Sequence, residues 1–199
     1  MRKLLAVVLL AAAMVAPAFA AEKGSMEIDG KLGLLFSPTL KMEMTGYSYD
    51  YDCKTTFSLG ADFFYYVEKD IAIGAGLEYV VPSEEDESGV GAFKYGTTNL
   101  FVQAKYNIAV ENDIFNNIYP LVQLGYGINS FDANISETEA DVENGLYWGI
   151  GLGTTIKENF IVELFYSFNY GELKPKTEPV TVDTTYKALK LKVGYKFSV

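Results

Sequence analysis

The apolar residues of this chain alternate with glycine and polar residues in about eight separate runs. The last run shows the pattern clearly, because Leu189, Leu191 and Val193 are each followed by a lysine or a glycine. An amphipathic helix repeats its apolar residues with a period near 3.6, so a period of two predicts β-strands. The chain should therefore fold as an all-β protein whose strands have one apolar face and one polar face.

The predicted strands are long enough to cross a membrane. We expect them over residues 26–36, 56–67, 71–81, 98–107, 118–129, 146–156, 160–170 and 188–199. Each has about 10 to 12 residues, the length that a tilted strand needs to cross hydrocarbon. Short turns, such as 68–70 and 157–159, alternate with long polar loops, such as 37–55 and 82–97. This sorting of turns and loops to opposite sides is typical of bacterial outer-membrane barrels.

A soluble ligand-binding barrel of the lipocalin type is the competing interpretation. The apolar face carries bulky side chains such as Phe57, Leu59 and Tyr79, whereas the other face carries glycines such as Gly76 and Gly151. The interior of an eight-stranded barrel is only just filled by side chains, so the bulky set must face lipid. Unpaired edges are costly in lipid, and the first strand must pair with the last. We predict a closed, eight-stranded, antiparallel, up-and-down transmembrane β-barrel.

The N-terminus indicates export. Arg2 and Lys3 precede an apolar stretch over 4–15, and Ala18, Phe19 and Ala20 form a small-x-small cleavage pattern. The apolar stretch is shorter than the roughly 20 residues of a membrane-spanning helix. We predict a cleaved signal peptide over 1–20 and a single barrel domain over 21–199, located in the outer membrane.

Strand parity points ten charged residues into the lumen. They are Glu27, Asp29, Asp62, Glu78 and Glu163, with Lys31, Lys105, Lys190, Lys192 and Lys196. Unpaired charges in a narrow lumen cost several kcal/mol each, so we expect ion pairs that plug the barrel. Glu163 is expected to pair with Lys196 or Lys192 on the neighbouring strand. The alternative is a narrow ion or solute path that opens when the pairs exchange.

The loops carry much of the acidity behind the formal net charge of −10. Two acidic groups stand out: Glu84, Glu85, Asp86 and Glu87, and then Asp132, Glu137, Glu139, Asp141 and Glu143. They form a solvated surface, bridge to lipopolysaccharide through divalent cations, or dock a basic partner. The negative sign disfavours nucleic acid.

The first long loop has a different composition, with Tyr47, Tyr49 and Tyr51 at alternate positions. Tyrosine supplies contact area at low entropic cost, which suits a binding surface for an extracellular ligand. The simpler interpretation is that the strands continue past the membrane as a hairpin.

The chain contains no histidine. This excludes a Ser-His-Asp triad and a histidine-based metal site. We predict no catalytic residues, no cofactor and no metal. The only cysteine, Cys53, has no partner within the chain for a disulfide.

The whole mature chain resembles the small outer-membrane β-barrels of the OmpA, OmpX and opacity-protein type. The terminal strand, with Tyr195, Phe197 and Val199 on one face, is similar to the strand that the outer-membrane assembly machinery reads. Family members commonly end on an aromatic residue, whereas this chain ends on Val199. The resemblance implies contact with lipid and lipopolysaccharide, and a role in membrane anchoring, adhesion or host-factor binding.

The lipid-modifying enzymes of this barrel class depend on histidine, so that activity is only a remote alternative. We therefore expect a monomeric barrel with a structural or surface-interaction role. A narrow porin-like channel is the main alternative.

Overall fold

The computed structural model describes residues 22–85, 93–110, 114–133, 140–157, 159–175 and 181–198. The predicted signal peptide over 1–20 lies outside the described residues, as does Val199 of the predicted assembly signal. The same holds for four of the acidic loop residues, Asp86, Glu87, Glu137 and Glu139.

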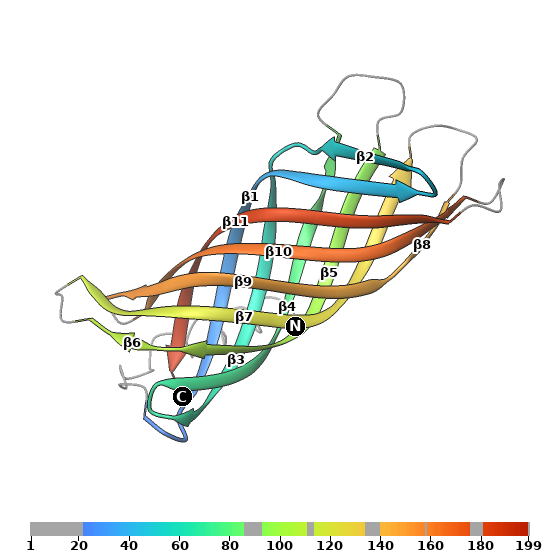
Figure 1. Ribbon diagram of the computed structural model, residues 1–199. Helices are drawn as coiled ribbons and strands as arrows, with labels where there is room; N and C mark the ends of the chain where they lie inside the picture. The colour runs from blue at the N-terminus through green and yellow to red at the C-terminus, as the bar shows by residue number, and fades with distance from the viewer. Residues whose placement is uncertain are drawn as a thin grey trace, which may run out of the picture.

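Eight long strands form a closed barrel (Figure 1). They are β1 (Met26–Met44), β3 (Thr56–Glu68), β4 (Ile71–Glu84), β5 (Phe93–Tyr106), β7 (Phe115–Ala133), β9 (Gly145–Ile156), β10 (Phe160–Pro175) and β11 (Val182–Ser198). Each pairs antiparallel with its neighbours, and β11 pairs with both β10 and β1. The predicted closed, eight-stranded antiparallel barrel is confirmed.

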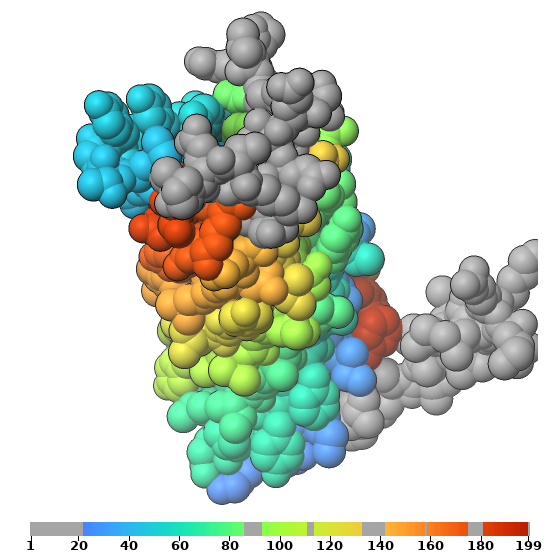
Figure 2. Space-filling model, turned by 90° about the vertical axis from the view of Figure 1, so that its right-hand side faces the viewer, coloured from blue at the N-terminus to red at the C-terminus, as the bar shows by residue number. Residues whose placement is uncertain are grey.

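Three short strands extend this ring. β2 (Tyr47–Asp52) pairs with β1, β6 (Ile108–Ala109) pairs with β7, and β8 (Ala140–Glu143) pairs with β10. The β1–β2 hairpin projects from one end of the barrel, as the light-blue atoms in Figure 2 show. We call this the loop end. The opposite end, where the described part of β1 begins and β11 finishes, is the turn end.

Several strands run further toward the loop end than the sequence predicts. β1 continues past residue 36 through a β-bulge between Phe36 and Thr39, where Ser37 has a φ of 36°. The bulge inverts the alternation, because Leu35 and Leu40 are both buried. A second bulge lies between Val80 and Ser83 of β4. Parity counted from the membrane-spanning part therefore fails beyond these points.

The two faces of the wall differ as the alternation predicts. Phe57, Leu59 and Leu152 on the outer face are each at least 60% exposed. Inside, aromatic residues fill the barrel toward its turn end, among them Phe64, Tyr66, Phe101, Tyr119, Tyr147 and Phe165. A second group, the mouth cluster, lies toward the loop end and comprises Leu35, Leu40, Cys53, Val80, Phe93, Tyr95, Tyr186 and Ala188. Among the described residues there is no helix with the length and apolarity to span a bilayer.

Candidate functional site

Lys31 is the centre of the first ion-pair group in the lumen. Its Nζ lies 2.7 Å from Asp62 Oδ2, 2.7 Å from Glu163 Oε1 and 3.4 Å from Asp29 Oδ2. All four side chains are buried, and the Tyr119 hydroxyl donates to Glu163 Oε1 at 2.9 Å. Three carboxyl groups from three strands thus share the single ammonium of Lys31.

Glu78 is the centre of a second group, with the opposite balance. Lys190 Nζ lies 2.6 Å from Glu78 Oε2, and Lys192 Nζ lies 3.1 Å from Glu78 Oε1. The Ser58 hydroxyl donates to the same Oε1 at 2.9 Å. Here two lysines share one carboxylate. The lumen therefore does not pair every acid with one base.

A third group lies near the turn end. Lys105 forms an ion pair with Glu27, and the Tyr66 hydroxyl donates to Glu27 Oε2 at 2.8 Å. The Lys105 ammonium also lies 4.0 Å from the centre of the Phe64 ring, a cation–π contact. Nine of the ten charged residues assigned to the lumen are buried, and Lys196 is half-buried.

The partner of Glu163 differs from the sequence prediction. Lys192 lies directly opposite Glu163 in the β10–β11 register, as expected for neighbouring strands. However, the Lys192 ammonium extends to Glu78, and the ion pair of Glu163 is with Lys31 of β1. Lys196 lies opposite Asp29 in the β1–β11 register. The lumen is narrow enough for long side chains to reach across a strand, so adjacency in the sheet does not determine the pairing.

Uncharged polar residues continue the network toward the loop end, and the sequence analysis missed them. The Tyr147 hydroxyl donates to Gln123 Oε1 at 2.8 Å, and Gln123 Nε2 donates to Gln103 Oε1 at 2.9 Å. Asn169 Nδ2 donates to Asn99 Oδ1 at 2.7 Å. These glutamines and asparagines have the inward parity of their strands, so the sequence could have identified them. The prediction considered only charged residues and therefore omitted them.

Glycines make room for these side chains. A Cβ added to Gly76 would lie 2.2 Å from Asp62 Oδ1 and 2.5 Å from a carbon of the Phe101 ring. One added to Gly125 would lie 2.0 Å from the backbone oxygen of Leu100. A larger residue at Gly76 would therefore displace side chains that fill the lumen, and one at Gly125 would push against the backbone of β5.

The mouth cluster packs across the loop end of the lumen. The rings of Tyr95 and Tyr186 are 4.8 Å apart, and the rings of Tyr51 and Phe93 meet edge-on at 5.5 Å. Cys53 is buried among them, and this burial raises the pKa of its thiol to about 11. The cluster connects the base of the hairpin to the barrel, so the hairpin begins from a fixed point.

The β1–β2 hairpin has an apolar face and a polar face. Opposite pairs such as Met44 with Tyr47 and Met42 with Tyr49 share the apolar face, whereas Asp50 lies on the polar face. Tyr47 is 66% exposed and Tyr49 is 53% exposed. Tyr51, by contrast, is half-buried against the mouth cluster. The structure thus bears out the hairpin interpretation and leaves two of the three tyrosines open.

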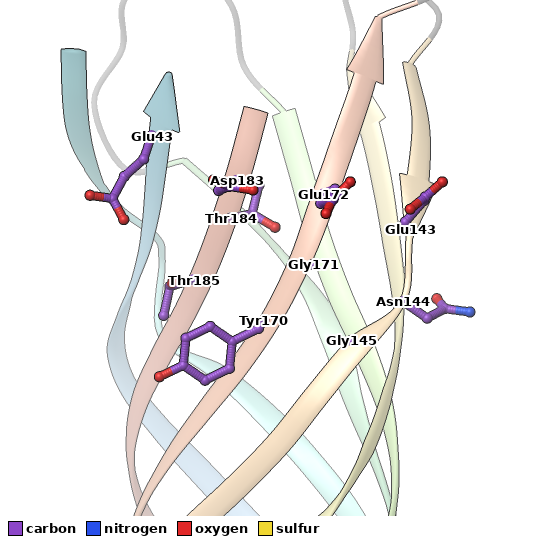
Figure 3. Close-up of a pocket in the computed structure, with 10 residues that line it drawn as sticks. All are labelled: Glu43, Glu143, Asn144, Gly145, Tyr170, Gly171, Glu172, Asp183, Thr184 and Thr185. Atoms are coloured by element: carbon purple, nitrogen blue, oxygen red, sulfur yellow. The ribbon is translucent and has the colours of Figure 1, made fainter. Parts of the chain in front are cut away.

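Four carboxylates form a row across the outer face of the rim (Figure 3). Asp183 of β11 lies opposite both Glu43 of β1 and Glu172 of β10, and Glu172 lies opposite Glu143 of β8. They line a groove of about 390 Å³ together with residues such as Tyr170. Within the described ranges, no three acidic or cysteine side chains are arranged to hold a metal ion. We call this set the rim row.

Two lysines accompany the rim row. Lys174 forms ion pairs with Glu143 and Glu172, and Lys41 lies 2.7 Å from Glu43. The hydrogen bond to Glu143 raises the pKa of Lys174, and the hydrogen bond to Glu43 raises that of Lys41. Lys174 is exposed and Lys41 is half-buried, unlike the fully buried lysines of the lumen, so water screens these pairs.

Aromatic residues lie on the outer face near both ends of the barrel. Trp148 and Phe168 stack with their rings 4.2 Å apart, one row of residues below Tyr170. At the turn end, Tyr195 of the predicted assembly signal contacts Phe160 at 5.5 Å and Phe197 at 4.9 Å. Bands of this kind lie at the two interfaces of a membrane-spanning barrel.

A family model described as "Outer membrane protein beta-barrel domain" matches residues 5–197. The chain belongs to this outer-membrane β-barrel family. It is therefore a protein of the bacterial outer membrane, as the alternation predicted. In such barrels the long loops face the outside of the cell and the short turns face the periplasm.

Several known proteins are similar to this chain at low sequence identity. An uncharacterised protein of Pasteurella multocida is 25% identical, with the match covering 70% of this chain and 74% of the relative. OprG of Pseudomonas aeruginosa has a TM-score of 0.51 at 14% identity, over 90% of this chain and 98% of OprG. Neisserial surface protein A has a TM-score of 0.49 at 14% identity, over 87% and 99%. The likeness to OprG shows the fold alone.

Proposed function

We propose that this barrel is a non-catalytic surface-interaction protein, and that its β1–β2 hairpin makes the contact. The observation that carries the proposal is the exposure of Tyr47 and Tyr49 on a hairpin that projects beyond the barrel mouth (Figure 2). Rigid aromatic side chains bury a large area on binding and lose little conformational entropy. The mouth cluster fixes the hairpin's base, which lowers the cost of ordering it on binding.

The filled lumen supports an anchoring role for the barrel itself. Three ion-pair groups and the aromatic residues between them occupy the interior, and the mouth cluster lies above them. A monomer of this kind needs no catalytic group, because its task is to hold the hairpin at the cell surface. The surrounding lipid and lipopolysaccharide are then its membrane partners, and Tyr195 and Phe197 its contribution to recognition by the assembly machinery.

The proposal is tested by replacing Tyr47 and Tyr49 together with serine and measuring adhesion of bacteria that display the protein to cultured host cells. We expect adhesion to fall to the level of cells without the protein. The matched control is Ser48→Ala, which changes the opposite face of the same strand and should leave adhesion unchanged. Full adhesion by the double tyrosine variant would contradict the proposal that the β1–β2 hairpin makes the contact.

A narrow channel is the second candidate, and the geometry around Lys31 favours it. Since three carboxylates lie within 3.4 Å of one ammonium, Lys31 has alternative partners, and exchange among them would open a path. Conductance of the refolded protein in a planar bilayer decides between the two. Silence, with insertion shown by heat-modifiable gel mobility, supports the closed lumen, whereas reproducible steps support the channel.

An enzymatic role is the remaining alternative. It is tested by comparing lipid A from cells with and without the protein, and we expect identical lipid A. A new acylation or deacylation product would contradict the non-catalytic proposal.

A further inference from the structure

The outer side of β2 is a sheet edge. At the loop end the strands follow the order β2, β1, β11, β10 and β8, so β2 lies at one margin of this sheet (Figure 1). Within the part of the chain that the structure describes, Tyr47–Asp52 pairs with β1 and with no other strand. An edge of this kind presents backbone donors and acceptors that can pair with another chain.

The register identifies which backbone groups face outward. Met44 and Tyr47 flank a two-residue turn, and such a flanking pair exchanges both of its hydrogen bonds. Hydrogen-bonded and non-hydrogen-bonded pairs then alternate, so Tyr49 and Tyr51 also bond to β1. The bond from Cys53 N to Pro38 O, at 2.7 Å, continues the same alternation. The N–H and C=O groups of the intervening residues Ser48, Asp50 and Asp52 therefore point away from β1.

At Lys54, the outward side of this segment already bonds to another strand. Lys54 has the same parity as Asp50 and Asp52, and its N–H donates to the Glu84 oxygen of β4 at 2.8 Å. One strand of the barrel thus already occupies the outward side at Lys54. The side is unoccupied along Ser48, Asp50 and Asp52 among the described residues.

Charge selects the kind of chain that fits this edge. The side chains of Asp50 and Asp52 lie beside the outward backbone groups, and β2 contains no basic residue. A second copy of β2 would bring aspartates against aspartates, which is unfavourable across a strand pair. A segment with lysine or arginine at alternate positions would place its charges beside Asp50 and Asp52. Its intervening apolar residues would then meet the face of Tyr47 and Tyr49.

We propose that β2 binds an extended, basic polypeptide segment of an external protein as an added strand. The inference rests on the proposed surface-interaction function and specifies its partner. Main-chain hydrogen bonds would supply much of the affinity, and alternate side chains would supply the specificity.

The experiment uses the whole refolded protein in lipid nanodiscs and a fluorescent peptide of about ten residues that alternates lysine and valine. Binding is measured by fluorescence anisotropy. Ser48→Pro removes an outward N–H and no bond to β1, because the N–H of Ser48 points away from β1. The hairpin should tolerate this change, since edge strands accept proline where the N–H faces solvent. We expect this variant to bind about two- to tenfold more weakly, since this is the effect of one lost net hydrogen bond. Ser48→Ala is the matched control and should bind like the wild type.

Two further measurements keep the test decisive. The same peptide with N-methyl groups at alternate residues should fail to bind the unchanged protein, which removes any dependence on the folding of Ser48→Pro. A glutamate–valine peptide should not bind, and Asp50→Asn should weaken the lysine peptide. Equal binding of the methylated peptide, or no binding of the unmodified one, would overturn the inference.

The outcome is separable from that of the proposed function. If Ser48→Pro weakens peptide binding as expected but the Tyr47 and Tyr49 double variant still adheres fully, the edge binds strands and the tyrosine face is not the adhesive surface. If adhesion requires the two tyrosines yet the lysine peptide never binds, the contact surface stands and its partner is not an added basic strand.

Discussion

The lumen and the rim row both bring carboxylates together, but they stabilise them in different ways. In the lumen, Asp29, Asp62 and Glu163 come from three different strands and converge on the ammonium of Lys31. On the rim, carboxylates lie side by side on neighbouring strands, with Lys174 and Lys41 at their margins. Desolvation explains the difference, because a buried carboxylate needs a counter-charge and an exposed one is solvated by water.

The comparison teaches where the fold depends on charge. Lumen charges support the structure, so altering them should change stability. Rim charges cost the structure a little, since like charges directly opposite in a sheet repel. Acidic residues that the fold tolerates at a small cost are available for interactions outside the barrel.

The largest effect should come from Lys31→Met. This change leaves three buried carboxylates without their shared cation, and breaking a buried ion pair costs about 3–5 kcal/mol. The measurement is the free energy of unfolding in urea with lipid vesicles. Lys41→Met is the matched control on the rim and should stay close to the wild-type value. Equal losses at the two sites would remove the distinction between lumen and rim.

Gly125→Ala tests the close approach of β5 to β7 in the barrel wall. Its new Cβ would lie 2.0 Å from the Leu100 oxygen and 2.6 Å from the Phe101 Cα. Overpacking of this kind costs about 1–3 kcal/mol, measured by the same unfolding experiment. At Gly30, on the lipid-facing side of β1, nothing lies within 4 Å of an added Cβ, so Gly30→Ala should have little effect. A Gly125→Ala variant as stable as wild type would show that the β5 backbone can move away from the added methyl group at no cost.

A double-mutant cycle sharpens the pairing inside the lumen. Lys31→Met combined with Glu163→Gln should give a coupling energy of about 0.5–3 kcal/mol, as residues in one ion-pair network do. Lys192→Met combined with Glu163→Gln should couple less, because Lys192 extends to Glu78. A larger coupling for Lys192 would restore the pair that the sequence predicted.

The smallest effect should come from the rim, with the opposite sign. Asp183→Asn removes the carboxylate that faces both Glu43 and Glu172, so it should raise the free energy of unfolding by about 0.2–1 kcal/mol at low salt. The gain should fade as salt screens the exposed charges. Asp62→Asn provides the contrast in the lumen and should destabilise. Destabilisation by Asp183→Asn would mean that the rim row supports the fold.

The alternation within the membrane was sufficient to predict the barrel. Positions such as Glu27, Asp62 and Lys190 were assigned inward because each strand has a period of two, and all three are buried. That period is a property of local backbone geometry, which a sequence records directly. Closure followed from the cost of open edges in lipid, and the pairing of β11 with β1 bears it out.

The rest depended on information that alternation does not carry. The bulge at Ser37 inverts the parity of β1, so the inward position of Leu40 could not be counted from the membrane-spanning part of the strand. Beyond the membrane both faces meet water, and the apolar signal that marks a strand disappears. The Lys31–Glu163 pair was missed because it skips a strand, and side-chain reach across a lumen is not encoded by neighbour order.

The seam between β1 and β11 has a consequence for the order of events during biogenesis. It joins Glu27 to Ser198, so the free edge of β1 cannot form its backbone hydrogen bonds until nearly the whole chain is present. Every intermediate shorter than this has two unpaired margins, each of which is unfavourable in lipid. Closure of the barrel is therefore a single late step, and the unpaired edges are not removed gradually as strands are added. Until that step, the growing sheet needs a temporary neighbour to shield its margins.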